Sequence, residues 1–333
     1  MFNNGISAVH IEPTARCNAA CAMCARTNNP NVLNNQGEIT LEEFKQHFPP
    51  KLLKTIYQWK WCGNFGDPIA AKDLNKMISY IVEHNAEANH IISTNGGIRS
   101  EKFWIELGEL MKAAGEKSHI QFHIDGLEDT NHIYRVGVKW DKLIRNVKAY
   151  ISTGAIADWY YIPFMHNEDQ IEEARKLSNE IGFRHFAVKI STRFQNSKSG
   201  FFENGAQLFP PLDPRYNVDD MQVNGELVCF AEARKEIYID AWNRFWPCCW
   251  TGSKFAKSTS FNNDLKTRSI EQILSDPETD KWINELYSDK KSVCNKRCTG
   301  QKQHVVEINN IQRPQKELWG KVTREVIATD RDL

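Results

Sequence analysis

Three cysteines near the N-terminus have a spacing that could hold a metal group. Cys17, Cys21 and Cys24 stand at positions i, i+4 and i+7. Three thiolates can ligate three irons of a four-iron cluster and leave the fourth open, as a catalytic metal keeps a free position. The amino and carboxylate groups of a methionine moiety could chelate that open iron. A structural zinc site that adds His10 is the alternative, although zinc ligands usually come in separated pairs.

Most of the other cysteines lie in the last third of the chain. The nine cysteines lie at positions 17, 21, 24, 62, 229, 248, 249, 294 and 298. Residues 1–10 lack the basic and apolar zones of a signal peptide, so we expect a reducing compartment in which metal or cluster ligation is favoured over disulfides. The distribution therefore indicates two metal-binding sites.

The composition does not favour nucleic acid or a membrane as a partner. The 333 residues include 42 basic and 42 acidic side chains, which gives a formal net charge of zero. No whole-molecule field favours nucleic acid or an anionic membrane surface. No apolar run approaches the roughly 18 residues that span a bilayer. We therefore expect a cytoplasmic protein with no nucleic-acid or membrane partner.

The first 190 residues show the alternation that positions such sites. Short apolar runs alternate with amphipathic stretches, which is typical of parallel βα units. Strands are predicted at 6–12, 57–62, 90–94, 119–125, 158–163 and 185–190, and helices at 40–48, 71–85, 100–114, 140–152 and 168–181. Sites in parallel sheets assemble at the carboxyl ends of strands, where each predicted strand up to 158–163 meets polar or Gly-rich residues.

The pattern changes after residue 192. A segment over 193–225 contains several Gly and Pro residues and is predicted to be a linker. A smaller second module is expected over 226–300, with a hairpin around residues 241–244. The tail over 301–333 is expected to be helical, with one charged helix over 314–329.

The first cysteine motif, CxxxCxxC directly after a first strand, resembles the radical S-adenosylmethionine superfamily. The resemblance covers residues 6–190 and implies a partial (β/α)6 TIM-like barrel, a [4Fe-4S] cluster on Cys17, Cys21 and Cys24, and S-adenosyl-L-methionine as a cofactor. Met23 stands where that family packs an apolar side chain on the adenine.

Further family motifs match one at a time. Gly63, Asn64, Gly66 and Asp67 lie in a GNFGDP loop that resembles the Gly-Gly-Glu-Pro loop for the cofactor's amino group, with Asp in place of Glu. His123, Asp125 and Gly126, followed by His132 and Arg135, resemble the Ser-Ile-Asp-Gly and His-x-x-Arg pattern of the peptide-modifying branch, with His in place of Ser. There the Arg pairs with the methionine carboxylate, which suits a planar charged fork. Thr94, Asn95, His166 and Asn167 match positions that line the cofactor and substrate cavity.

The second cysteine group resembles the auxiliary-cluster module called SPASM, or its shorter form, twitch. Cys229, Cys248, Cys294 and Cys298 would then saturate one further [4Fe-4S] cluster, with Cys249 as a possible replacement for Cys248. Asn243 holds a glycine position of that module, since Asn also visits the left-handed conformation. A four-sulfur site could equally hold zinc.

The resemblance implies an oxidoreductase or maturase. Such an enzyme cleaves S-adenosylmethionine reductively to a 5'-deoxyadenosyl radical, takes a substrate hydrogen atom and oxidises or crosslinks the substrate. Peptide or protein maturation is the favoured hypothesis, although no leader-binding domain is visible at the N-terminus. The second hypothesis is dehydrogenation of a small carbohydrate-like alcohol. A flavodoxin or ferredoxin would supply electrons. A non-catalytic iron-sulfur or zinc protein is the alternative from another class, disfavoured because a structural metal needs neither Arg135 nor the GNFGDP loop.

Overall fold

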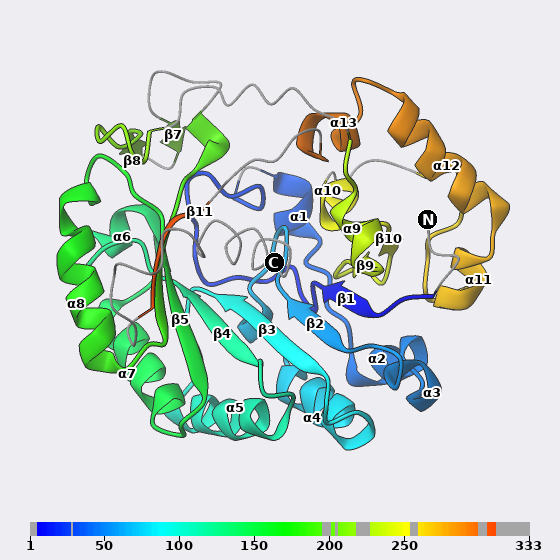
Figure 1. The fold of residues 1–333 in the computed structure, drawn as a ribbon, viewed down its shortest axis with the longest axis horizontal. Helices are drawn as coiled ribbons and strands as arrows, with labels where there is room; N and C mark the ends of the chain where they lie inside the picture. The colour runs from blue at the N-terminus through cyan, green and yellow to red at the C-terminus, as the bar shows by residue number, and fades with distance from the viewer. Residues whose placement is uncertain are drawn as a thin grey trace.

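A curved, mostly parallel sheet forms the body of the molecule (Figure 1). The computed structural model describes residues 5–27, 29–194, 201–203, 206–217, 227–253, 259–298 and 305–310. Within them the sheet has the strand order β10-β9-β1-β2-β3-β4-β5-β6-β11. In chain order its strands are β1 (Ala8–Ile11), β2 (Gln58–Trp61), β3 (Asn89–Thr94), β4 (His119–His123), β5 (Ile156–Tyr161), β6 (His185–Lys189), β9 (Glu236–Ile239), β10 (Phe245–Trp246) and β11 (Val305–Asn310).

Helices cover the outer face of this sheet, as Figure 1 shows for α4, α5, α7 and α8. The helices of the barrel region are α1 (Pro30–Asn34), α2 (Leu41–His47), α3 (Pro50–Leu53), α4 (Leu74–His84), α5 (Glu101–Ala113), α6 (Asn131–Tyr134), α7 (Trp140–Ile151) and α8 (Ile171–Ile181), with 3-10 turns η1 (Pro68–Ala70), η2 (Glu168–Gln170) and η3 (Thr192–Phe194). Local signals set the ends: a capping box of Thr40 and Glu43 opens α2, and Gly182, at φ +98°, closes α8. The six strands and five helices expected from the sequence are confirmed, and with them the partial β/α barrel.

The two faces of the sheet differ in chemistry because strand side chains alternate. On one face, Trp59 packs on Phe44 of α2, and Phe122 packs on Trp104 of α5 with ring centroids 5.5 Å apart. Val9 and Trp159 lie on the same face and are fully buried. This apolar face is therefore the outer one. The opposite, inner face is polar.

The second half of the chain adds to the same sheet rather than forming a sheet of its own. Strand β9 pairs in parallel with β1, and β10 returns antiparallel beside β9. The sheet thus crosses the boundary expected near residue 226. Asn243, in the turn between β9 and β10, has φ +61°, so its expected left-handed conformation is confirmed. The helices here are α9 (Phe230–Ala233), α10 (Cys249–Gly252), α11 (Ile270–Leu274), α12 (Pro277–Ser288) and α13 (Val293–Cys298).

Two expectations for connecting segments need correction. The linker expected over 193–225 contains a short antiparallel pair, β7 (Phe201–Glu203) and β8 (Ala206–Leu208). The tail expected to be helical contains β11, which pairs antiparallel with β6, because the open edge of β6 offers unpaired backbone groups. The charged helix expected over 314–329 lies outside the described residues.

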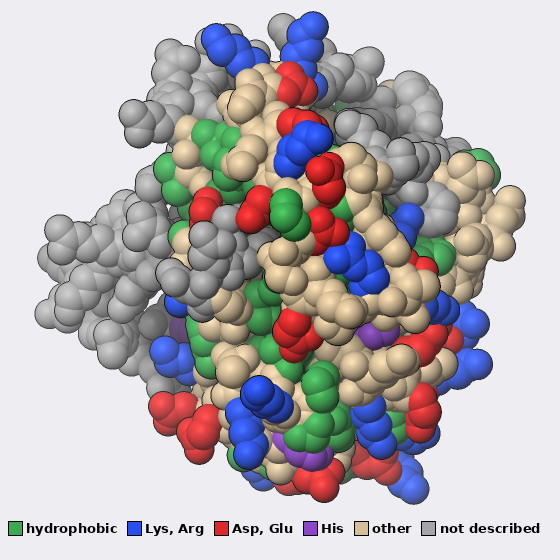
Figure 2. Space-filling model, turned by 90° about the vertical axis from the view of Figure 1, so that its right-hand side faces the viewer, with side chains coloured by type: hydrophobic (Ala, Val, Ile, Leu, Met, Phe, Trp, Pro, Cys, Tyr) green, Lys and Arg blue, Asp and Glu red, His purple; other side chains and the backbone are tan. Residues whose placement is uncertain are grey.

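None of the helices in the described ranges is long and apolar enough to cross a membrane. On the face turned to the viewer in Figure 2, acidic and basic side chains are interspersed, in keeping with the formal net charge of zero.

Candidate functional site

The loop after β1 brings the first three cysteines together at the carboxyl end of the barrel. Cys21 is buried, and Cys17 and Cys24 are half-buried. The amide of Cys24 donates to the carbonyl of Cys21 at 3.0 Å, and the amide of Ala20 donates to the carbonyl of Val136 at 2.9 Å, which ties the loop to the segment after β4. Burial first, then Asp67 and the other two thiols, raise the pKa of Cys17 to about 12. Such thiols are protonated until a metal displaces the proton.

The arrangement of the three thiols bears on the metal group that they could hold. Among the residues described by the structure, no three His, Cys, Asp or Glu side chains converge as one ion requires. In an iron-sulfur cluster each thiolate binds a different iron, so the ligands need not converge on one point. Besides burial, Cys24 raises the pKa of both Cys17 and Cys21, so the thiols lie close together. The donor set therefore fits a multi-iron group.

Cys17 is connected to the next two strands by a buried hydrogen-bond chain. The Asn95 side-chain amide lies 3.6 Å from the Cys17 sulfur and donates to Asp67 at 2.7 Å. Asp67 also accepts from the Thr94 hydroxyl at 2.8 Å and from the Asn95 backbone amide at 2.9 Å. Both carboxylate oxygens thus face β3. Asp67 therefore holds Asn95 against the cysteine loop, a use of the GNFGDP loop's acid that its sequence match does not reveal.

Cys21 has a matching connection from the other side. Nη1 of Arg135 lies 3.7 Å from the Cys21 sulfur, and its Nε donates to Asp125 at 2.7 Å. Asp125 is fully buried and also accepts from the Ile162 amide at 2.7 Å. Asn167 donates to the carbonyl of Asp125 at 2.9 Å and so joins the same network. Burial raises the pKa of Asp125, and the Arg135 guanidinium opposes that rise.

Other expected residues occupy more peripheral positions. Met23 is buried, and its carbonyl accepts from Nη1 of Arg193 at 2.8 Å. Burial, with help from Arg135 and Lys189, lowers the pKa of His123 well below its usual value, so the imidazole is neutral. His166 stacks on Phe164 with centroids 5.3 Å apart, while no hydrogen bond or ion pair joins His132 to the network among the described side chains.

Two residues that the sequence analysis did not identify also form hydrogen bonds that support the site. Arg193, just after β6, also reaches the Tyr134 hydroxyl at 3.3 Å. Glu12 ends β1, is fully buried, and accepts from the amides of Phe65 and Gly66, each at 2.7 Å. Polar residues at strand ends are the signal that could have identified both.

Glycines allow the GNFGDP loop to lie this close. A Cβ on Gly63 would overlap Glu12 Oε1, and one on Gly66 would overlap the Thr14 carbonyl oxygen. Asn64 donates to the Tyr238 hydroxyl at 3.1 Å and to the Cys249 carbonyl at 2.9 Å. The Tyr238 hydroxyl in turn donates to Glu12 at 2.6 Å. The loop is thereby fixed between β1 and β9.

The second cysteine group also comes together. Burial and the thiols of Cys248, Cys298 and Cys229 raise the pKa of Cys294 to about 12. Burial, Cys248 and Cys229 do the same for Cys298. The amide of Val228 donates to the Cys298 carbonyl at 3.0 Å, which joins the two ends of the group.

The adjacent Cys249 lies in different surroundings. Burial raises its pKa well above the usual value, and the groups that add to this are Cys248, Glu236 and Cys62. Glu236 and Cys62 belong to the inner face of the barrel. Cys248 is therefore the member of the adjacent pair that lies with the other three cysteines.

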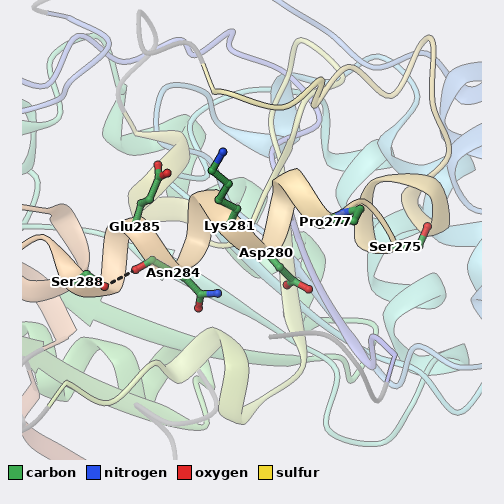
Figure 3. A pocket seen from close by; sticks show the side chains of 7 residues that line it. All are labelled: Ser275, Pro277, Asp280, Lys281, Asn284, Glu285 and Ser288. Carbon is green, nitrogen blue, oxygen red and sulfur yellow. Dashed lines mark hydrogen bonds between the residues drawn. The ribbon is translucent and has the colours of Figure 1, made fainter.

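A surface hollow lies away from both cysteine groups. It has a volume of about 630 Å³ and lies along α12 (Figure 3). Lys281 and Glu285 point to one side of the helix, whereas Asp280 and Asn284 point to the other, so the side chains do not converge on one ligand. Its lining consists of Ser275, Pro277, Asp280, Lys281, Asn284, Glu285 and Ser288.

Comparison with known proteins identifies the fold. No family model matches the chain. A GTP 3',8-cyclase of Helicobacter pylori is 20% identical over 323 residues, which cover 87% of this chain and 95% of that one. Among solved structures, Streptococcus suis SuiB bound to S-adenosylmethionine aligns with a TM-score of 0.59 at 13% identity, over 84% of this chain and 67% of SuiB.

Two further solved structures match over greater shares of their own length. The enzyme anSMEcpe with bound AdoMet aligns with a TM-score of 0.55 at 13% identity, over 98% of this chain and 96% of that one. BtrN in complex with AdoMet and 2-DOIA aligns with a TM-score of 0.50 at 13% identity, over 93% and 100%. These neighbours are radical S-adenosylmethionine enzymes, so the chain has the fold of that superfamily, and the fold that the resemblance implies is confirmed.

Proposed function

We propose that this chain is a radical S-adenosylmethionine enzyme whose catalytic cluster is held by Cys17, Cys21 and Cys24. The observation that carries the proposal is the pair of donors aimed at two of these sulfurs. Asn95 faces Cys17 and Arg135 faces Cys21, and each donor is held by a buried carboxylate. When bound, the cluster and S-adenosylmethionine supply one-electron cleavage chemistry that removes a substrate hydrogen atom.

The chain's own residues bind and orient. Donors that face cysteine sulfurs stabilise negative charge there and tune a cluster's potential. A guanidinium has five N–H donors. In Arg135, Nε meets Asp125 and Nη1 meets Cys21, which leaves donors for a cofactor carboxylate. The loop of Gly63 to Asp67 is fixed in place by Glu12, as a preorganised binding loop requires.

The second site is proposed to hold a fully ligated [4Fe-4S] cluster on Cys229, Cys248, Cys294 and Cys298, in a twitch-like module. Four protein thiolates leave no open iron in this second cluster. Its proposed role is therefore to accept the electron that the substrate radical gives up when it is oxidised. This suits oxidation or crosslinking of a peptide. SuiB has been solved with its precursor peptide SuiA, and anSMEcpe with the Cp18Cys peptide. We place the enzyme in the cytoplasm, with a flavodoxin or ferredoxin as electron donor.

Dehydrogenation of a small carbohydrate-like alcohol is the second candidate. The observation in its favour is the BtrN alignment, which covers all of BtrN, whereas only 67% of SuiB is covered.

Iron analysis and cofactor cleavage test the proposal. Anaerobically reconstituted protein is expected to carry about eight irons. The triple variant Cys17→Ala, Cys21→Ala, Cys24→Ala is expected to carry about four and to release no 5'-deoxyadenosine. Cys62→Ser, which removes a thiol outside both groups, is the matched control and keeps all the irons.

The double variant Cys294→Ala, Cys298→Ala separates the two sites. It is expected to carry about four irons and to go on releasing 5'-deoxyadenosine, while any product that needs electron transfer to the second cluster is lost. Zinc at the second site would leave about four irons in the unmodified protein. A triple variant that cleaves S-adenosylmethionine as fast as the unmodified enzyme would refute the radical assignment.

A further inference from the structure

The polar inner face of the barrel becomes accessible at the carboxyl ends of the strands. In β3, β4 and β6 the inner residues Ser93, His123 and Lys189 keep part of their surface. The preceding inner residue of each strand is buried, namely Ile91, Gln121 and Ala187. The register places His123 beside Tyr160 of β5. These side chains therefore line the space that a molecule entering from the cysteine side would meet.

Lys189 reaches from β6 toward the middle of this space. Its Nζ lies 5.7 Å from the centroid of the Tyr160 ring, a cation–π contact. Burial and Arg135 lower the pKa of His123, two strands away, and the Lys189 ammonium adds to that effect. It also opposes the rise that burial and Glu12 give the pKa of Cys62, which follows β2. A charge on β6 that acts on groups beside β2 and β4 must point across the inner face. Tyr160 also contacts His123, with ring centroids 5.5 Å apart, and so packs against both.

Within the part of the chain that the structure describes, no counter-charge on the inner face pairs with this ammonium. Lys60 is paired with Glu236 at 2.8 Å, and Arg135 with Asp125 at 2.7 Å. Glu12 is occupied by two backbone amides and the Tyr238 hydroxyl. Among the described side chains, none forms an ion pair with Lys189.

The Lys189 ammonium has a neutral polar side chain, His123, near it. His123 is uncharged, so it adds no repulsion to an incoming anion and can share a hydrogen bond with it. A half-buried ammonium without a partner is costly unless an anion meets it, because its charge is only partly hydrated. The inner face is thus complementary to a ligand that carries one negative group.

We propose that Lys189, with His123 and Tyr160 beside it, binds an oxyanion of the substrate, a carboxylate or a phosphate, inside the barrel. The inference rests on the proposed function, because it takes the inner face to be where substrate enters. It narrows the substrate class to molecules with an anionic group: a peptide through an acidic side chain or its carboxyl terminus, or a phosphorylated small molecule. Lys189 is then a specificity-determining residue.

Direct binding of small anions tests this without any turnover. Reconstituted holoenzyme saturated with S-adenosylmethionine is titrated calorimetrically with inorganic phosphate and, separately, with acetate. A charged hydrogen bond in a partly buried site changes affinity by about ten- to a hundredfold. Lys189→Met is expected to weaken binding of the preferred anion by that factor, whereas Lys189→Arg keeps it within about threefold. Lys176→Met, which removes an exposed lysine of α8, is the matched control and binds as the unmodified enzyme does.

The two arms identify the source of the oxyanion. Tighter phosphate binding supports a phosphorylated substrate, and tighter acetate binding supports a carboxylate. Equal binding by Lys189→Met and the unmodified enzyme overturns the inference, as does no binding of either anion to the unmodified enzyme. Release of 5'-deoxyadenosine is measured in parallel. Cleavage of S-adenosylmethionine without Lys189-dependent anion binding refutes the inference alone. Anion binding without cleavage refutes the proposed function alone.

Discussion

Removal of the Arg135 side chain is expected to have two effects that can be separated. Arg135→Ala takes away a proposed carboxylate ligand of the cofactor, and it also leaves Asp125 buried without its cation. Breaking a buried pair by removing one partner costs about 3 to 5 kcal/mol of unfolding free energy. Loss of one charged hydrogen bond to the cofactor costs about 1.5 to 3 kcal/mol, or roughly ten- to a hundredfold in affinity.

The pH dependence of the Arg135→Ala variant has a defined sign. Burial already raises the pKa of Asp125, and the variant removes the guanidinium that opposes the rise. The folded state then holds a proton that the unfolded state releases, so the unfolding free energy falls as pH rises from the unfolded pKa of Asp125, about 3.9, to its higher folded pKa. The loss of stability is therefore complete only above the folded pKa of Asp125 and is relieved on acidification.

The double variant Asp125→Asn, Arg135→Ala provides the control. It removes the stranded charge but keeps an oxygen for the Ile162 amide. Urea unfolding followed by circular dichroism is expected to show most of the stability regained, while equilibrium dialysis with labelled S-adenosylmethionine still shows the weakened affinity. Cofactor affinity that returns together with stability would refute the reasoning, because Arg135 would then act on the fold alone.

Two further perturbations address the groups that hold the site. Burial raises the pKa of Glu12 from 4.5 to about 7, so its folded form keeps a proton that the unfolded chain has lost, and the unfolding free energy should fall across that window. In Glu12→Gln this contribution, at most about 1.4 kcal/mol per pH unit, should vanish, and equal slopes for the two proteins would contradict the assignment. Asn95→Ala removes a donor to the Cys17 sulfur, so a redox titration monitored by electron paramagnetic resonance should find the first cluster's potential more negative. The exposed variant Lys176→Ala should leave that potential unchanged.

The barrel was predictable because each strand carries its own signal. Apolar runs such as HIIST and HIQFHID, bounded by polar residues, identify strands without knowledge of their partners. The loop of Cys17 to Cys24 was equally local, since three thiols within eight residues stay close in any compact loop. Asp67 and Asp125 were located correctly at strand ends, but nothing local indicates that each holds a donor against a cysteine.

The parts that sequence reasoning missed depend on partners far along the chain. Glu12 becomes a loop anchor only because Tyr238 arrives beside it, and the pairing of β9 with β1 is not encoded in either strand alone. Cys248 and Cys249 are chemically identical, and only the start of α10 at Cys249 sends the two thiols to different surroundings. Their roles needed three-dimensional information.

The parallel pairing of β1 with β9 also bears on how the chain folds as it is made. The two strands are separated by roughly 230 residues of sequence, and a ribosome adds about 5 to 20 residues per second. The first strand therefore leaves the ribosome about 10 to 45 seconds before its partner exists. During that interval one edge of β1 lies open, and the unpaired backbone groups of such an edge can pair with another chain.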